Sequence, residues 1–158
     1  MSCEIVVDGA LPCSFAISKA SLKAAAKYFA SRSSKRIGIP FRSVTVILQD
    51  DAESDEVHRG IMGVEGATDV ITQAYEAMPP EPEGIYGELY VNTDQARRFS
   101  NIVRNWSAEK ELLLYIAHGM DHLSGADDFE PADRARMRRR ELKWMSDYAR
   151  AQAGKLRR

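Results

Sequence analysis

The sequence predicts a small domain of mixed α and β structure, and three observations lead to this class. The chain has 158 residues, a length typical of one domain that buries a core of its own. Hydrophobic residues make up 44% and charged residues 28% of the chain, an ordinary globular mixture that argues against general disorder. Short β-branched segments alternate with longer segments of helical periodicity, which is typical of α/β and α+β domains.

The first half of the chain contains three predicted strands and two predicted helices. We expect strands at Glu4–Val7, Val44–Leu48 and Asp69–Thr72, because these segments are short and rich in β-branched residues. A helix capped by Ser18 should run to about Arg32, since its apolar residues recur at helical spacing. A weaker helix is expected over residues 51–60, where acidic residues in the first turn interact favourably with the helix dipole.

The second half should contain one more strand and three helices. The prolines of Met78–Gly84 indicate a loop, and Gly87–Val91 then returns as a strand. A helix is expected at Thr93–Arg104, followed by a helix that starts after Ser107, ends at Gly125 and is apolar nearly all round, as in a buried central helix. The last helix should begin at Pro131 and end near residue 150. These elements place one domain at residues 1–150 and a basic tail at 151–158.

Charge is unevenly distributed along the chain. The formal net charge of −1 identifies no partner. Residues 50–94 contain twelve acidic residues and one arginine, a charge of −11, whereas residues 131–158 contain ten basic and three acidic residues, a charge of +7. This asymmetry indicates either a nucleic-acid surface near the C-terminus or a solvated helix face followed by a frayed tail. The candidate surface consists of Arg134, Arg136, Arg138, Arg139 and Arg140.

The compartment expected from the sequence is the cytoplasm, with no membrane association. The two cysteines, Cys3 and Cys13, are too few for a disulfide framework and are expected to be reduced. The N-terminal segment has neither the basic region nor the long apolar region of a secretion signal. The longest strongly apolar run, Leu112–Ala117, is far too short to span a bilayer.

The strongest functional signal is a pair of histidines at the end of the predicted central helix. His118 and His122 are two of the three histidines in the chain and have i, i+4 spacing, so their side chains project from the same helix face. Such a pair can hold one Zn²⁺, and Asp127 or Asp128, beyond the turn at Gly125, is a candidate third ligand. Three protein ligands leave a position for water, as in catalytic zinc sites. The alternative is two histidines with ordinary structural hydrogen bonds.

The same segment resembles a known family. In zinc peptidases with the HExxH motif, a glutamate follows the first histidine, but this chain has Gly119 there, so that mechanism does not transfer. The segment is similar instead to the signature HGxLHLxGxxH of the YbeY endoribonucleases, bacterial enzymes of rRNA maturation. The matching residues are His118, Gly119, His122, Leu123 and Gly125. Two positions depart from the signature, because Asp121 replaces a leucine and Asp128 stands where most members have a third histidine.

Further segments resemble the family over most of the chain. Thr68–Thr72 is similar to its TDVIT-type strand, Gly87–Leu89 to its GDI strand and Met137–Glu141 to the helix after the metal loop. The resemblance implies a mixed sheet of about four strands flanked by helices, with Asp128 as the third metal ligand. It also implies a catalytic role for Arg59, which follows His58 where the family has Asn-Arg; without the resemblance, Arg59 reads as an ion-pair partner of Asp55 or Glu56.

The function expected from these observations is a zinc-dependent endoribonuclease. The metal ligands would be His118, His122 and Asp128, and Arg59 and His118 would be the catalytic residues. The cofactor would be one Zn²⁺ or another divalent ion, and the partners would be RNA, in particular rRNA, and the small ribosomal subunit, in maturation and quality control. The alternatives are a metal-dependent hydrolase of another substrate and a non-catalytic ribosome-associated factor. The roles of Asp121 and His58 are left open.

Overall fold

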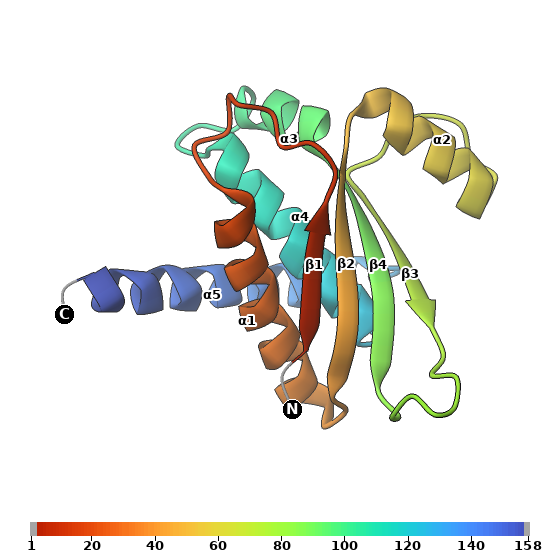
Figure 1. Ribbon diagram of the computed structural model, residues 1–158. Coiled ribbons are helices and arrows are strands. Elements are labelled where there is room, and N and C mark those ends of the chain that lie inside the picture. The colour runs from red at the N-terminus through yellow and green to blue at the C-terminus, as the bar shows by residue number, and fades with distance from the viewer. Residues whose placement is uncertain (1–2, 157–158) are drawn as a thin grey trace.

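A mixed four-stranded sheet organises residues 3–156, the part of the chain that this computed structural model describes (Figure 1). The strands are β1 (Glu4–Asp8), β2 (Phe41–Gln49), β3 (Val70–Tyr75) and β4 (Ile85–Asn92). The helices are α1 (Lys19–Ile37), α2 (Asp51–Met62), α3 (Thr93–Ser100), α4 (Ala108–Leu123) and α5 (Pro131–Leu156). The expected fold class and all nine expected elements are therefore confirmed.

The strand order is β1-β2-β4-β3, in which β1, β2 and β4 are parallel and β3 is antiparallel to β4. Helix α1 packs on β1 and β2, whereas α4 packs on β4 and β3 and contacts α1 and α5. In Figure 1, α4 and α5 both run behind the sheet, and α2 lies beyond the end of β2. The core therefore lies between one face of the sheet and the layer of α1 and α4, as the apolar character of α4 predicted.

Helix α4 lies unusually close to β4 because glycine and leucine residues face each other in two reciprocal pairs. A Cβ atom added to Gly119 of α4 would lie 2.7 Å from a δ-carbon of Leu89 in β4. A Cβ atom added to Gly87 of β4 would lie 2.6 Å from a δ-carbon of Leu123 in α4. Since neither position has room for a side chain, these two glycines set how closely the C-terminal half of α4 packs on the sheet.

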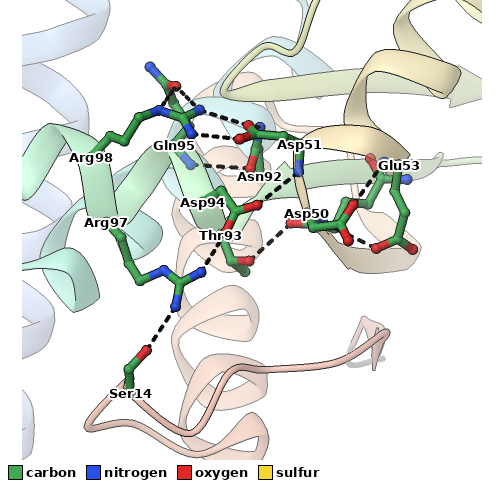
Figure 2. Close-up of polar contacts among 11 residues, drawn as sticks. Ser14, Asp50, Asp51, Glu53, Asn92, Thr93, Asp94, Gln95, Arg97 and Arg98 are labelled. Atoms are coloured by element: carbon green, nitrogen blue, oxygen red, sulfur yellow. Dashed lines mark hydrogen bonds and ion pairs between the residues drawn. The ribbon is translucent and has the colours of Figure 1, made fainter.

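A polar network at the carboxyl ends of β2 and β4 fixes the starts of α2 and α3 (Figure 2). Asp50 caps α2 in a capping box with Glu53, and Asn92 caps α3. The two caps are joined because the Asn92 side-chain amide donates to the Asp51 carboxylate at 2.9 Å. Arg98 binds the same carboxylate through two hydrogen bonds of 2.6 and 2.7 Å. This network holds α2 and α3 beside each other at one end of the sheet.

The boundaries differ from the expected ones mainly at helix ends. Helix α1 continues past Arg32 to Ile37 and stops where Gly38 adopts φ 70°, a left-handed conformation that glycine allows. Helix α3 ends at Ser100 instead of Arg104, since residues 101–105 form an exposed turn. Helix α5 continues through most of the predicted basic tail to Leu156, and residues 157 and 158 lie outside the described part.

Other expectations concern single side chains. Both cysteines are free, as predicted. Trp144 is buried in the core, whereas Trp106 is only half-buried and donates its indole N–H to Glu111 at 2.7 Å. Across residues 3–156, no helix combines the length and the apolar character that crossing a bilayer requires.

Candidate metal centre

Three side chains converge where α4 ends. The Nε2 atoms of His118 and His122 are 3.0 Å apart, which follows from their spacing on one helix face. A carboxylate oxygen of Asp128 lies 3.6 Å from the first of these nitrogens and 3.4 Å from the second. All three side chains are partly buried, and their donor atoms lie within 4.8 Å of one another.

The loop after α4 selects Asp128 over its neighbour. Gly125 has φ 94° and its N–H donates to the His122 carbonyl, so the chain reverses immediately after the helix. Asp127 turns back to accept the N–H of Phe129 at 2.8 Å and thereby stabilises the turn. Asp128 is left facing the histidines, whereas Asp127, the other candidate ligand, is held by the turn itself.

Hydrogen bonds at Nδ1 leave both Nε2 lone pairs free for a cation. His122 Nδ1 lies 3.0 Å from the carbonyl oxygen of Ala126, which can only accept, so Nδ1 carries the proton. His118 Nδ1 lies 2.9 Å from a carboxylate oxygen of Glu141. This is the arrangement that fixes the tautomer of metal-binding histidines. Tetrahedral ligands about 2.0–2.1 Å from a zinc ion are about 3.3 Å apart, close to the spacing of these three atoms. The residues therefore fit a divalent ion.

Glu141 is the functional residue that the sequence reasoning missed. It is fully buried on α5, among core-facing Met137 and Trp144, and its other carboxylate oxygen has no hydrogen-bond partner within residues 3–156. A glutamate at a core position of an amphipathic helix was the signal that could have identified it. Burial raises the pKa of Glu141 above its usual value, although hydrogen bonding to His118 opposes this effect.

The charges around His118 favour its protonated or metal-bound form. Burial alone lowers the pKa of His118, but the hydrogen bond and charge of Glu141, with the charges of Asp69 and Asp128, raise the pKa above its usual value. The same negative groups would stabilise a cation bound at Nε2. The charges around His118 and the positions of the three donor atoms therefore both favour a bound cation.

The three side chains open into a hollow of about 360 Å³ between α4, α2 and β3. Met62 forms one wall at the end of α2, and Asp69 lies at the start of β3. One carboxylate oxygen of Asp69 accepts the backbone N–H of Val70 at 2.7 Å. The sequence indicates only a strand at residues 69–72, yet the fold places the exposed Asp69 carboxylate beside the metal cluster.

Comparison with known proteins decides the family. The model of the family described as endoribonuclease YbeY matches residues 14–149, most of the chain. The chain belongs to the YbeY family. Proteins named endoribonuclease YbeY from Rhodopirellula baltica, Desulfitobacterium hafniense and Thermotoga maritima are 40%, 36% and 34% identical over 63%, 65% and 66% of the chain. These matches span 50%, 69% and 66% of the relatives' own lengths, so the chain corresponds to about half of the first relative and two-thirds of the others.

A solved structure supports the same relationship. The solution structure of TM1509 from Thermotoga maritima matches this fold with a TM-score of 0.55 and 25% sequence identity. The alignment covers 94% of this chain and 93% of that protein. The likeness therefore extends over almost the whole length of both chains.

Asp121, the residue that departs from the YbeY signature, is a buried anion beneath the histidines. It is fully buried, and Arg140 of α5 binds it through both carboxylate oxygens at 2.9–3.2 Å. Arg36 of α1 lies 3.5 Å from the same carboxylate. Because α5 places Arg140 on Asp121 and the next residue, Glu141, on His118, two consecutive residues connect α5 to the end of α4.

Two other candidate residues, Arg59 and His58, are not among the side chains that line the hollow. Arg59 is mostly exposed and pairs with Asp55, one turn earlier on α2, which is the alternative that the sequence left open. It is three residues before Met62, which lines the hollow, so both lie on the same side of α2. His58 donates from Nδ1 to the carbonyl of Gly66 at 2.8 Å and thereby holds the loop before β3.

The basic residues of α5 do not form one uninterrupted RNA-binding face. Arg134 donates to the backbone carbonyl of Asp128 at 3.2 Å and so supports the metal loop. Arg136 pairs with Asp133, and Arg140 is bound to Asp121. These guanidinium groups already have protein partners, so only part of the candidate surface can contact a phosphate backbone without breaking another contact.

Proposed function

We propose that this protein is a metal-dependent endoribonuclease that holds one Zn²⁺, or another divalent ion, with His118, His122 and Asp128. The observation that carries the proposal is the convergence of two imidazole lone pairs and a carboxylate on one point beside an open hollow. Membership of a family whose named members are endoribonucleases supports RNA as the substrate.

The residues around the site have separable roles in this proposal. A bound zinc ion supplies an activated water at neutral pH and polarises a phosphoryl oxygen. We place His118 in both the metal-binding and the catalytic set, because Glu141 holds its ring at Nδ1 while its Nε2 faces the proposed metal position. Three protein ligands leave space for water, which supports a catalytic role over a purely structural one.

Arg59 is the proposed clamp for the phosphate under attack. Its guanidinium matches a phosphate through two parallel hydrogen bonds. Its present partner, Asp55, is a half-buried residue one turn earlier on the same helix, and a surface ion pair of this kind contributes little to stability. Exchanging that partner for a phosphate in the hollow therefore costs little free energy.

The finer parts of the proposal come from the family resemblance. We infer that the RNA is single-stranded rRNA, that the protein acts on the small ribosomal subunit in maturation and quality control, and that it does so in the cytoplasm. The domain that carries this activity would be residues 1–150, with 151–158 as a basic extension.

The test combines metal analysis with RNA cleavage in matched variants. The wild-type protein should contain about one divalent ion per chain and cleave single-stranded RNA. His118→Ala and His122→Ala should lose both properties, and Asp128→Asn should weaken both, since an amide is a poorer ligand than a carboxylate. The control is Asp127→Asn, which alters the neighbouring turn but leaves the three donor atoms in place.

The outcomes separate the alternatives. Full metal content in both histidine variants would disprove the site, and equal losses in Asp127→Asn and Asp128→Asn would disprove the ligand assignment. A wild-type protein that binds its ion tightly but cleaves no RNA would instead support a non-catalytic factor.

A further inference from the structure

A second hollow of about 150 Å³ adjoins the metal centre on the far side of His118. It shares Asp69 and His118 with the first hollow and extends from them toward α3 and α5. Its other walls include Gln95 and Phe99 of α3, the buried Glu111 of α4 and Arg138 of α5. A strand of substrate placed at the metal centre could therefore continue past His118 into this second space.

Arg138 is the positively charged side chain that lines this hollow. Within residues 3–156 its guanidinium makes no hydrogen bond or ion pair, and its side chain is exposed. Arginines around it are engaged: Arg140 on Asp121, and Arg98 on Asp51. An arginine that lines a hollow without a protein partner can bind an anion there without first breaking another contact.

The α3 wall offers groups suited to a nucleotide base. The side-chain oxygen of Gln95 accepts from Arg98 at 2.6 Å, and Arg98 is itself anchored on Asp51 (Figure 2). The Gln95 amide is therefore fixed with its oxygen toward Arg98, and its NH₂ group has no acceptor within the described part of the chain. Phe99, one turn further along α3, is half-buried and adds an aromatic ring to the same wall.

We propose that this second hollow is a subsite for the nucleotide next to the one at the metal centre, with Arg138 binding its phosphate. The inference rests on the proposed function, because it assumes that the substrate is RNA. A cation, an amide donor and an aromatic ring are the groups that bind the phosphate, the edge and the face of a single-stranded nucleotide. The hollow is also lined by the carboxylates of Asp69 and Glu111, which repel a phosphate and so favour its placement at Arg138.

The test compares Arg138→Ala with Arg139→Ala. Arg139 is the adjacent exposed arginine of α5 but does not line the hollow, so its variant removes the same charge without touching the subsite. Binding is measured by fluorescence anisotropy of the metal-loaded protein with a non-cleavable 2′-O-methyl oligonucleotide. Arg138→Ala should weaken binding about tenfold or more, as expected for a lost charge-assisted contact. Its log–log salt dependence should decrease by about 0.7, the value for one phosphate contact on a single strand.

Two further measurements exclude indirect effects. Metal content should be unchanged in Arg138→Ala, and with cleavable RNA its KM should increase more than its kcat decreases, since the contact lies away from the reacting bond. Arg138→Lys should recover the salt dependence but only part of the affinity, because a lysine keeps the charge and loses the bidentate geometry.

The two proposals fail in different ways. If the wild-type protein binds and cleaves RNA but Arg138→Ala behaves like Arg139→Ala, the subsite is overturned and the endoribonuclease stands. If the wild-type protein neither binds the oligonucleotide nor cleaves RNA, both proposals are overturned.

Discussion

Replacing Glu141 with glutamine should weaken metal binding while leaving all three proposed ligands in place. Glu141 is fully buried, and its carboxylate accepts the Nδ1–H of His118 at 2.9 Å. Glutamine retains an acceptor of similar size but removes the negative charge that makes the opposite ring nitrogen a stronger ligand. Loss of such an outer partner lowers metal affinity about 10–100-fold, which corresponds to about 1.4–2.8 kcal/mol. Competition with a chromophoric chelator near neutral pH measures this affinity directly.

The stability of the metal-free protein provides an independent readout for Glu141→Gln. Burial raises the pKa of Glu141, so its ionised form is costly in the folded state and a neutral amide should not lower the metal-free thermal midpoint. The matched control is Asp133→Asn on the same helix, since within residues 3–156 Asp133 pairs only with the exposed Arg136. If Glu141→Gln binds zinc as tightly as Asp133→Asn does, Glu141 does not tune His118 and the reasoning is refuted.

Three other predictions test the fold and the clamp. Gly119→Ala should cost about 1–3 kcal/mol of unfolding free energy, because its methyl group would overlap Leu89; an unchanged denaturant midpoint would contradict the close packing. The Asp51 pKa is lowered to about 2, chiefly by its hydrogen bonds from Arg98, so its stabilisation is present above the ordinary value of 3.8 and is lost as pH falls through about 2. Asp51→Asn should therefore reduce the loss of unfolding free energy between pH 3.8 and about 2. An unchanged pH dependence in this range would exclude the Asp51–Arg98 ion pair as its cause. Arg59→Ala should reduce RNA turnover by about two orders of magnitude with metal content unchanged, and a normal rate would make Arg59 a surface ion-pair residue.

The sequence was sufficient for the parts of the site that depend on local geometry. The i, i+4 spacing of His118 and His122 places both rings on one helix face whatever the tertiary structure. The choice of Asp128 over Asp127 needed the family resemblance, because both lie just beyond the turn and either could reach the histidines in an unfolded loop. The structure gives the physical reason for the choice: Asp127 accepts the backbone N–H of the turn itself.

Gly119 indicates one thing in the sequence and another in the structure. In the sequence it appears only as the absence of the HExxH glutamate. In the structure it permits α4 to approach Leu89, and the reciprocal pair of Gly87 and Leu123 lies on the same interface. A glutamate at position 119 would point into the packed sheet instead of the hollow, so the close packing that positions the histidines excludes a general base there.

The contacts of Arg140 and Glu141 could not be predicted because they depend on how α5 is set against α4. Arg140 and Glu141 are neighbours in sequence, and their side chains leave the helix about 100° apart. His118 and Asp121 are three residues apart on α4, which separates their directions by about 60°. Only one rotation of α5 about its axis satisfies both contacts at once, the ion pair to Asp121 and the hydrogen bond to His118. Because the fully buried Asp121 carboxylate would be uncompensated without Arg140, the ion pair in particular selects that rotation. The same rotation directs Arg138, one turn before Glu141, toward the hollow beside His118, so the contacts that orient the metal ligand also position the proposed RNA contact.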